Sequence, residues 1–308
     1  MPELPEVHTT VEGIKKTAVG KSIKDVWSDY HVETARSSQQ SLKNEKYFEN
    51  FKKIVRGSKI IRAERRGKNI LIHLNNRHTI IVHMKMTGHI MVGKYEKVGR
   101  AQGASWEVIE DGPLQDPYNK FVHLVFSLSD GRQLVLSDAR KFASVTISKS
   151  DELNLHHNVG NLGLEPLDKN FSLEKFKKIF ETKRNIPIKS LLMDQSVIAG
   201  IGNIYSDEIL WAVGVHPTSV PHKIPVQMQN EIYKAMQKIL NFSIKHGGDS
   251  KSDYRNIYGE KGGFQNFHKV YGRKGQRCQK SGCGGIIARM VIKGRSSHFC
   301  PSHQKRYG

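Results

Sequence analysis

The sequence predicts an α+β protein with more than one domain, and three observations lead to this class. Short segments rich in β-branched residues, separated by turn residues, fill the first half of the chain. From about residue 172 the apolar residues recur at helical spacing instead. All three cysteines lie between Cys278 and Cys300, near the carboxyl end. At 308 residues the chain is long enough for about two domains, each with its own apolar core.

The chain carries a large positive charge. It has 49 Lys and Arg against 29 Asp and Glu, a formal net charge of +20. Such a surplus favours a polyanionic partner through phosphate neutralisation and counterion release. Nucleic acid is the leading candidate, and a basic surface that serves only solubility is the alternative. Residues 241–308 contain 14 Lys and Arg against 3 Asp and Glu, so we expect this end to bind phosphate.

Targeting signals are absent from the sequence. No run of about 18 apolar residues occurs, and the amino terminus lacks the apolar segment of a signal peptide. We therefore expect a cytoplasmic protein with no membrane partner. Three clustered cysteines in such a protein indicate a metal site rather than disulfides.

The first expected element is an amphipathic helix. Val7, Val11, Ile14 and Ala18 share one face at helical spacing, which predicts a helix over residues 6–18.

Strand patterns follow this helix. The segments read as an antiparallel sandwich or barrel that extends to about residue 150. Turn residues such as Ser129-Asp130-Gly131 divide them. Residues 94–120 are expected to form a long loop without an assigned role. The predicted strands are NILIHL (69–74), TIIVHMKM (79–86), FVHLVFSL (121–128) and RQLVLSD (132–138).

The second half is predicted to be helical, with a domain boundary between about 150 and 170. The patterns cover residues 172–180, 188–200, 204–214 and 226–248. Between two of them lies Gly200-Ile201-Gly202-Asn203, where paired glycines would let backbone approach a phosphate at a helix start. A plain turn between helices explains this motif equally well.

The four residues Cys278, Cys283, Cys300 and His303 have the spacing of a zinc site. Two close pairs separated by 16 residues suit a β-hairpin whose ends bring four ligands around one structural Zn²⁺. His298 competes with His303 as the fourth ligand. Three buried cysteines and a surface histidine are the alternative without metal.

Residues 293–297 would form the tip of this hairpin. A metal-held hairpin presents its tip rigidly, so Arg295 is suited to insertion into a nucleic-acid groove. A solvated arginine on a loop tip is the simpler interpretation.

The chain opens with MPELPEV, a segment whose residues could take part in catalysis. Removal of Met1 would expose Pro2 as a secondary amine with a pKa near 8, able to attack at neutral pH. Condensation with an aldehyde-like carbon gives a cationic iminium, which promotes elimination of a neighbouring phosphate. Glu3 would carry protons. From these residues alone, an ordinary helix start is the alternative.

Seven motifs in order along the chain resemble those of one family, the formamidopyrimidine-DNA glycosylase and endonuclease VIII family of base-excision repair enzymes. The motifs are MPELPEV, Arg65-Arg66-Gly67-Lys68, HMKMTG (83–88), SDARKFA (137–143), IKSLLMDQSVIAGIGNIYSDEILWAVGVHP (188–217), VYGRKGQRC (270–278) and the terminal cysteine hairpin.

The resemblance implies three domains with DNA bound between them. An amino-terminal β-sandwich with flanking helices would cover residues 1–150, a helical domain with a helix-two-turns-helix 151–265, and a zinc hairpin 266–308. It also implies a monomer that acts on double-stranded DNA containing an oxidised base.

The resemblance assigns roles residue by residue. Pro2 is similar to the Schiff-base nucleophile, Glu3 to the acid that helps open the deoxyribose ring, and Glu6 to a second amino-terminal carboxylate. The positions similar to phosphate contacts are Lys68, Asn203, Tyr271, Arg295 and, less closely, His83. The positions similar to those that fill the space of the flipped nucleotide are Met86, Arg140 and Phe142.

Some features depart from the family or leave alternatives open. The usual hairpin has four cysteines, whereas here the first pair encloses four residues and His303 replaces the last cysteine. The 94–120 loop looks longer than the family's. Met86 and Phe142 lie in strand-like segments and could be core residues.

The resemblance implies a bifunctional enzyme, a DNA glycosylase and AP lyase that cleaves the strand by β,δ-elimination. Leu4 and Phe142 look like the oxidised-purine branch, whose substrates are 8-oxoguanine and formamidopyrimidines. An endonuclease VIII-like enzyme for oxidised pyrimidines and an inert DNA-binding zinc protein are the alternatives. Residues 247–260 resemble the loop that covers the extruded base.

Overall fold

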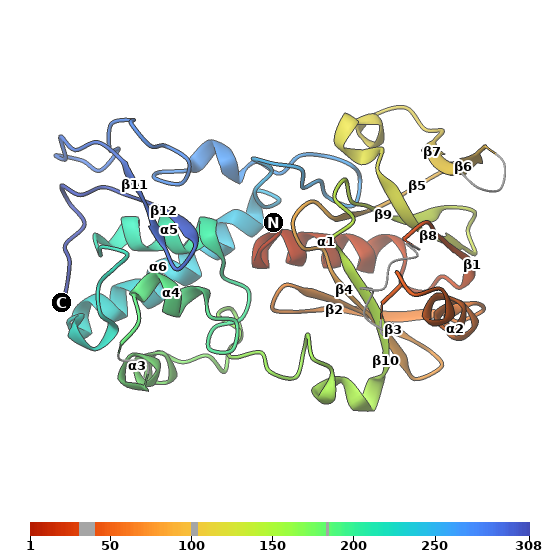
Figure 1. The fold of residues 1–308 in the computed structure, drawn as a ribbon, viewed down its shortest axis with the longest axis horizontal. Coiled ribbons are helices and arrows are strands. Elements are labelled where there is room, and N and C mark those ends of the chain that lie inside the picture. Colours follow the sequence, from red (N-terminus) through yellow and green to blue (C-terminus); the bar gives the residue numbers. More distant parts are fainter. Residues whose placement is uncertain (31–40, 100–103, 183–184) are drawn as a thin grey trace. The chain divides into compact units, whose positions relative to one another are not determined.

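The computed structural model describes residues 1–30, 41–99, 104–182 and 185–308, and it divides into two compact units (Figure 1). Unit 1 comprises residues 1–160 and 246–263, and unit 2 comprises residues 161–245 and 264–308. The segment 246–263 thus belongs to unit 1, whereas the domain bounds expected from the sequence included it in the helical domain, 151–265.

Unit 1 is a sandwich of two four-stranded antiparallel sheets, the first of the two predicted alternatives. Their strand orders are β1-β8-β9-β5 and β10-β4-β3-β2. The strands are β1 (Ile23–Ser28), β2 (Ile60–Arg66), β3 (Asn69–Leu74), β4 (His78–His83), β5 (His89–Gly93), β8 (Val122–Leu128), β9 (Gln133–Ser137) and β10 (Ser144–Lys149).

Helix α1 (Leu4–Thr17) packs against strands of both sheets, namely β2, β3 and β5. Its side chains Val7, Val11 and Ile14 are part of the sandwich core. The apolar face predicted from the sequence is therefore the buried face, and it fixes the amino terminus on the sandwich.

Helix α2 (Glu45–Val55) was not predicted. Phe48, Phe51 and Val55 are buried at helical spacing, and the Asn44 side chain caps the first turn by accepting from the Tyr47 N–H at 3.0 Å. Lysines and glutamates between the apolar positions obscured this periodicity.

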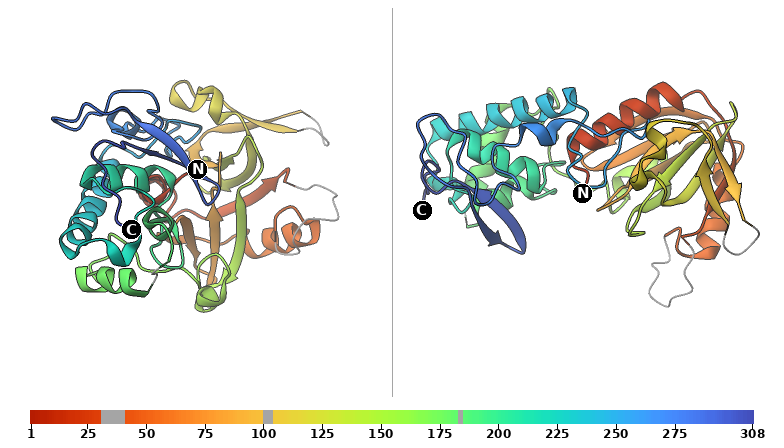
Figure 2. Two further views of the ribbon diagram at one scale, coloured as in Figure 1. Left: turned by 60° about the vertical axis from the view of Figure 1, so that its left-hand side comes forward. Right: turned by 90° about the horizontal axis from the view of Figure 1, so that it is seen from above.

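The predicted 94–120 loop contains regular structure. Strands β6 (Tyr95–Val98) and β7 (Ser105–Val108) form a hairpin that projects from the sandwich (Figures 1 and 2), followed by the 3₁₀ turns η1 (Pro113–Gln115) and η2 (Pro117–Asn119). Residues 100–103 of that loop lie outside the described ranges.

Two predicted elements are shorter than expected. Strand β4 ends at His83 because the next residues form a turn, closed by the Gly88 N–H donating to the Met84 carbonyl at 3.1 Å. Helix α4 ends at Met193 rather than residue 200, because the Gln195 side chain bonds the backbone of Gly200 and Ile201 in the following turns.

Unit 2 consists of helices and one hairpin. None of the described helices in the chain is long and apolar enough to cross a membrane. In unit 1, the 3₁₀ turn η3 (Ser150–Leu155) follows β10, the last strand of the sandwich. The elements of unit 2 are α3 (Leu173–Thr182), α4 (Ile188–Met193), α5 (Asn203–Val213), η4 (Pro221–Lys223), α6 (Val226–Lys245), η5 (Phe264–Phe267), β11 (Ala288–Ile292) and β12 (Arg295–Phe299).

Replacement of Gly13 in α1 with alanine is expected to lower the free energy of unfolding by about 1–3 kcal/mol. Alanine is the better helix former by roughly 0.5–1 kcal/mol, but its methyl group would overlap the Ile257 side chain. Urea denaturation measures the change, with Glu12→Ala on the same helix as control. A stabilised Gly13→Ala protein would show that residue 257 does not pack on α1.

Candidate functional site

The amino-terminal residues are held firmly in unit 1. Pro2 is buried, and Glu3 is the N-cap of α1. The Glu3 N–H donates to Glu6 Oε2 at 2.7 Å, and Asp249 N–H donates to Glu6 Oε1 at 2.7 Å. The Tyr254 hydroxyl donates to the Glu6 carbonyl at 3.0 Å. Glu6 therefore joins the start of the chain to the 246–263 segment.

Lys68 and His83 lie at the same end of one sheet, because Asn69 pairs with His83 across β3 and β4. His83 Nδ1 accepts from the Lys85 N–H at 3.0 Å. Burial, aided by the positive charges of Lys85 and Lys68, lowers the pKa of His83 to about 3. His83 is thus neutral near pH 7 and can contact a phosphate only as an N–H donor.

The three predicted wedge residues are exposed. Met86 lies in the turn after β4 and is 39% exposed, and Phe142 follows β9 and is 48% exposed. The Arg140 guanidinium lies 4.4 Å from the centroid of the Phe142 ring. This exposure argues against the alternative that Met86 and Phe142 are core residues.

The two wedge segments are bonded to each other through Asp138, which is fully buried. Its carboxylate accepts from the Thr87 hydroxyl, from the Ala143 N–H at 2.7 Å and from the Tyr30 hydroxyl at 3.2 Å. Sequence reasoning gave Thr87 and Asp138 no role, although both lie inside the motifs that carried the resemblance. Small polar residues at strand ends were the available signal.

Unit 2 carries the remaining phosphate-contact candidates, and α5 positions each of them. Asn203 is the first residue of α5, after the N-cap Gly202. Within the described part of the chain, Asn203 Oδ1 is buried without a hydrogen-bond partner. The helix start also presents backbone N–H groups, which suit an anion.

Arg295 is positioned by a buried ion pair. Lys189 Nζ lies 2.6 Å from Asp207 Oδ1 on α5, and both side chains are at most 1% exposed. Asp207 also accepts from the Ser297 hydroxyl at 2.9 Å and the His298 N–H at 2.8 Å, so β12 is fixed to α5. Loss of one partner of such a pair costs roughly 3–5 kcal/mol.

Tyr271 is held by the neighbouring acid of α5. The Glu208 carboxylate accepts the backbone N–H groups of Lys269, Val270 and Tyr271 at 2.8–3.1 Å. Adjacent residues of one helix thus orient two segments that carry candidate DNA contacts. Neither Asp207 nor Glu208 was predicted, because an acidic pair on a helix gives no signal of its partners.

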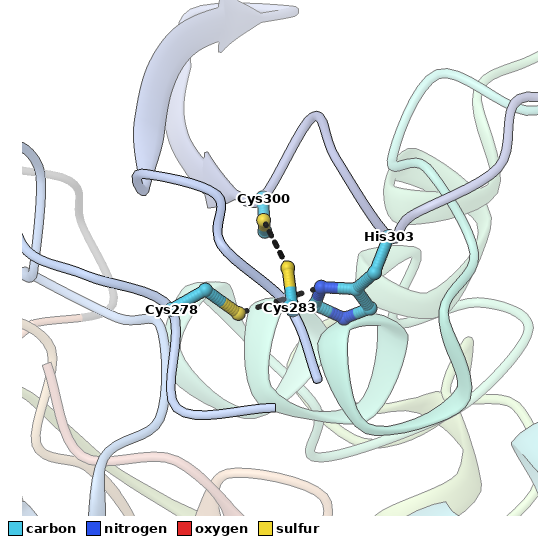
Figure 3. A group of neighbouring side chains, drawn as sticks. All are labelled: Cys278, Cys283, Cys300 and His303. Atoms are coloured by element: carbon cyan, nitrogen blue, oxygen red, sulfur yellow. Dashed lines mark hydrogen bonds between the residues drawn. The ribbon is translucent and has the colours of Figure 1, made fainter. Parts of the chain in front are cut away.

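The candidate metal ligands converge (Figure 3). The ligand atoms of Cys278, Cys283, Cys300 and His303 all lie within 4.8 Å of one another. Cys283 Sγ and Cys300 Sγ are 3.7 Å apart, and Cys278 Sγ and His303 Nδ1 are 3.4 Å apart. Tetrahedral zinc with ordinary bond lengths requires about 3.8 and 3.6 Å for such pairs.

Surrounding groups suit metal binding. Trp211 Nε1 donates to Cys278 Sγ at 3.3 Å, and His303 Nε2 donates to the Trp211 carbonyl at 3.1 Å, which directs Nδ1 at the cluster. Burial opposes ionisation of Cys300, but backbone N–H groups of His303 and Ser302 outweigh it and lower its thiol pKa to about 7. His298 instead bonds Asp207 and is not part of this cluster.

The hairpin turn lies within the predicted residues 293–297 but is shorter than predicted, because β12 already begins at Arg295. Lys293 and Gly294 connect β11 to β12, with φ of 44° and 74°. Two positive φ values are typical of a type I′ turn, which glycine makes easily. Arg295 follows at the start of β12 and is exposed.

Comparisons with known proteins identify the family. The formamidopyrimidine-DNA glycosylase N-terminal domain model matches residues 1–145, and the corresponding H2TH domain model matches residues 162–255. A formamidopyrimidine-DNA glycosylase of Streptococcus pneumoniae is 34% identical over 306 residues, covering 99% of this chain and 100% of that protein. One from Bacillus cereus is 32% identical with the same coverage.

Solved structures agree. The Lactococcus lactis Fpg in complex with DNA containing an abasic site has a TM-score of 0.81 and 29% identity, covering 99% of this chain and 100% of that one. The same enzyme with DNA containing N7-benzyl-Fapy-dG has a TM-score of 0.80 and 29% identity, with the same coverage. The chain therefore belongs to the formamidopyrimidine-DNA glycosylase family and is a DNA glycosylase of DNA repair.

Proposed function

We propose that this glycosylase removes oxidised purines from double-stranded DNA and then cleaves the strand, with Pro2 as nucleophile. After removal of Met1, the Pro2 amine attacks C1′ of the damaged nucleotide, and the base leaves as the C1′–N bond breaks. Glu3 then protonates O4′, and the C1′–O4′ bond breaks as the Pro2 nitrogen forms an iminium with C1′. The iminium accepts electrons when a C2′ proton is lost and the 3′ phosphate leaves, and loss of the C4′ proton then expels the 5′ phosphate.

The observation that carries this proposal is the fixed position of Pro2 and Glu3 at the start of a helix that packs on both sheets. An amine and a carboxyl group held next to each other suit nucleophilic attack with proton transfer. Glu3 is 2% exposed and follows Pro2 directly in the chain, so we assign to its carboxyl group the proton transfer that opens the ring.

The remaining candidates are assigned by chemistry. Lys68, neutral His83, Asn203, Tyr271 and Arg295 offer donors to phosphate oxygens. In the same proposal Met86 and Phe142 fill the space of the extruded nucleotide, and Arg140 pairs with the orphaned cytosine. The exposure of these three side chains supports that role. Glu6 acts indirectly, because its carboxylate already accepts two backbone N–H groups.

Oxidised purines are favoured over oxidised pyrimidines by Leu4 and Phe142, the two positions that resemble the oxidised-purine branch. Leu4 is fully buried beside the predicted nucleophile. Excision assays on duplexes that each carry 8-oxoguanine, a formamidopyrimidine or an oxidised pyrimidine test the choice. A preference for the pyrimidine lesion would contradict it.

We also propose that the Cys278, Cys283, Cys300 and His303 cluster holds one structural Zn²⁺. Three sulfurs and one imidazole nitrogen at these separations fit tetrahedral zinc. Trp211 supports two of these ligands, because its Nε1 donates to Cys278 Sγ and its carbonyl accepts from His303 Nε2. When bound, the ion crosslinks the two ends of the β11–β12 hairpin, which is too small to have a core of its own.

The metal proposal predicts that His303→Ala or Cys300→Ser loses zinc and most DNA binding, while the sandwich of unit 1 stays folded on its own core. His298→Ala is the matched control and should keep one zinc per chain. Elemental analysis gives the stoichiometry, and Trp211 fluorescence reports the site in a variant without Trp27 and Trp106. One full equivalent of zinc in His303→Ala would exclude this ligand set.

The nucleophile proposal predicts a covalent borohydride-trapped adduct between lesion DNA and a protein whose Met1 is shown by mass spectrometry to be absent. Pro2→Gly leaves a primary amine and should weaken strand cleavage, while Glu3→Gln should reduce base release about 100-fold or more. An inert DNA-binding protein would give no adduct. Excision by Glu3→Gln at the unaltered rate would remove Glu3 from its role.

Loss of a phosphate contact and loss of a residue that fills the space of the flipped nucleotide are expected to change DNA binding in different ways. Arg295→Ala should weaken binding to intact and lesion duplexes alike and flatten the salt dependence by roughly one charge. Phe142→Ala should spare intact DNA but reduce capture of the lesion, and Arg140→Ala should also blur the choice of opposite base. Binding measured across a salt series, with the exposed Arg306→Ala and Leu155→Ala as controls, separates the classes. Equal losses on both duplexes for Phe142→Ala would mean that it is no wedge.

A further inference from the structure

The 249–259 segment of unit 1 contains a buried arginine that no part of the proposed chemistry uses. Arg255 is 1% exposed, and its Nη2 donates to Asp116 Oδ1 at 3.0 Å. Its guanidinium carbon lies 4.7 Å from the centroid of the Tyr118 ring. Its Nη1 donates to the carbonyls of Ser252 and Tyr254 at 3.2 and 2.9 Å. Arg255 therefore both shapes its own segment and joins it to residues 110–120.

A second contact joins the same two segments. Asn119, 2% exposed, donates from Nδ2 to the Gly259 carbonyl at 3.2 Å and to the Pro113 carbonyl at 2.9 Å. Gly259 has φ of 81°, and a Cβ there would lie 2.8 Å from both Asn119 Nδ2 and Leu114 Cα. Only glycine allows so close an approach of the two backbones.

The opposite side of the 249–259 segment contacts the predicted nucleophile region. Asp249 N–H and the Tyr254 hydroxyl bond the carboxylate and the carbonyl of Glu6, whose other carboxylate oxygen accepts from Glu3. The 249–259 segment thus lies between the amino-terminal residues and the 110–120 segment. It forms no helix or strand, so its position depends on these side-chain contacts, on the Val92 N–H bond to the Ile257 carbonyl and on the packing of Ile257 in the sandwich core.

The opposite charges of Arg255 and Asp116 explain why these two side chains pair with each other. A buried guanidinium without a carboxylate is strongly unfavourable, so Arg255 stays buried only while Asp116 faces it. Burial opposes ionisation of Asp116, but hydrogen bonds from the Tyr118 N–H and Arg255 outweigh it and keep its pKa below the usual value. The pair lies outside the apolar sandwich core, to which the 249–259 segment contributes Ile257.

We propose that Asp116, Tyr118 and Asn119 are positioning residues for base excision, which hold the 249–259 segment over the extruded oxidised base through Arg255 and Gly259. This inference rests on the proposed function and on the resemblance of residues 247–260 to the loop that covers the extruded base. A covering segment matters only while a base is present. Loss of the Arg255 and Gly259 contacts leaves the bonds of Asp249 and Tyr254 to Glu6 in place, so it should slow base release but not strand cleavage at a site that has already lost its base.

The test compares two substrates in single-turnover kinetics, a duplex with 8-oxoguanine and the same duplex with a preformed abasic site. Asp116→Asn and Asn119→Ala are expected to slow base release about tenfold and to leave abasic-site cleavage within about twofold of the unaltered protein. Asp116→Glu keeps a carboxylate and should recover most of the rate. Asp111→Asn removes an exposed carboxylate of the same segment and is the matched control.

Hydrogen exchange of the free protein provides a readout without substrate. Amides of residues 249–259 should exchange faster in Asp116→Asn than in Asp111→Asn, while those of β3 and β4 stay protected. Equal slowing on both substrates, unchanged base release, or unchanged exchange would each overturn the inference. Failure of the proposed function is distinguishable, because then the unaltered protein itself would neither cleave the abasic duplex nor form a borohydride adduct.

Discussion

The position of the amino-terminal residues in unit 1 depends on two hydrogen bonds that the Glu6 carboxylate accepts. One oxygen accepts the Glu3 N–H and the other accepts the Asp249 N–H, so one buried group fixes both the start of the chain and a segment more than 240 residues later. A chain terminus is normally poorly ordered, and a terminal nucleophile would lose its orientation there. The bridge removes that freedom, since a buried carboxylate must keep its donors.

Buried carboxylates also hold backbone segments in unit 2. Asp207 and Glu208 are buried neighbours on α5, and their carboxylates accept from the backbone of β12 and of residues 269–271 respectively. A side chain that reaches out to DNA, such as that of Arg295, makes few contacts within the protein that could fix its position. Buried acids that bond the adjacent backbone provide the rigidity. Exposed Arg295 and half-buried Tyr271 are thereby oriented by residues that do not contact DNA in this proposal.

Much of the fold follows from local pattern. The periodicity of Val7, Val11 and Ile14 predicted α1, and strand β3 was predicted from a short segment rich in β-branched residues. Helix α2 was missed because its three buried residues are interleaved with charge. The 94–120 region contains Gly, Pro and Asp, so its β6–β7 hairpin gave no alternating signal. Helix α4 was predicted too long because a side chain, Gln195, ends it by bonding backbone.

The site was predicted unevenly for a physical reason. Cys278, Cys283, Cys300 and His303 are close in sequence, and their spacing determines their chemistry, so the cluster could be found and the structure brings it together. The supports Asp138, Asp207 and Arg255 bond groups from roughly 18 to 140 positions away. No local spacing encodes such pairs, because an acid or arginine reads as a surface residue until its partner is known.

Asp116 and Arg255 show how this uneven predictability bears on function. The sequence gave the 94–120 region no role, and charge counting treats Arg255 as one more contribution to a basic surface. In the structure that arginine is withdrawn from solvent and neutralised, so it adds nothing to phosphate attraction. A positive charge that is buried against a carboxylate instead restricts the backbone around it. An exposed basic residue such as Arg295 thus suits DNA binding, whereas Arg255 and Lys189, each buried against a carboxylate, hold segments in place.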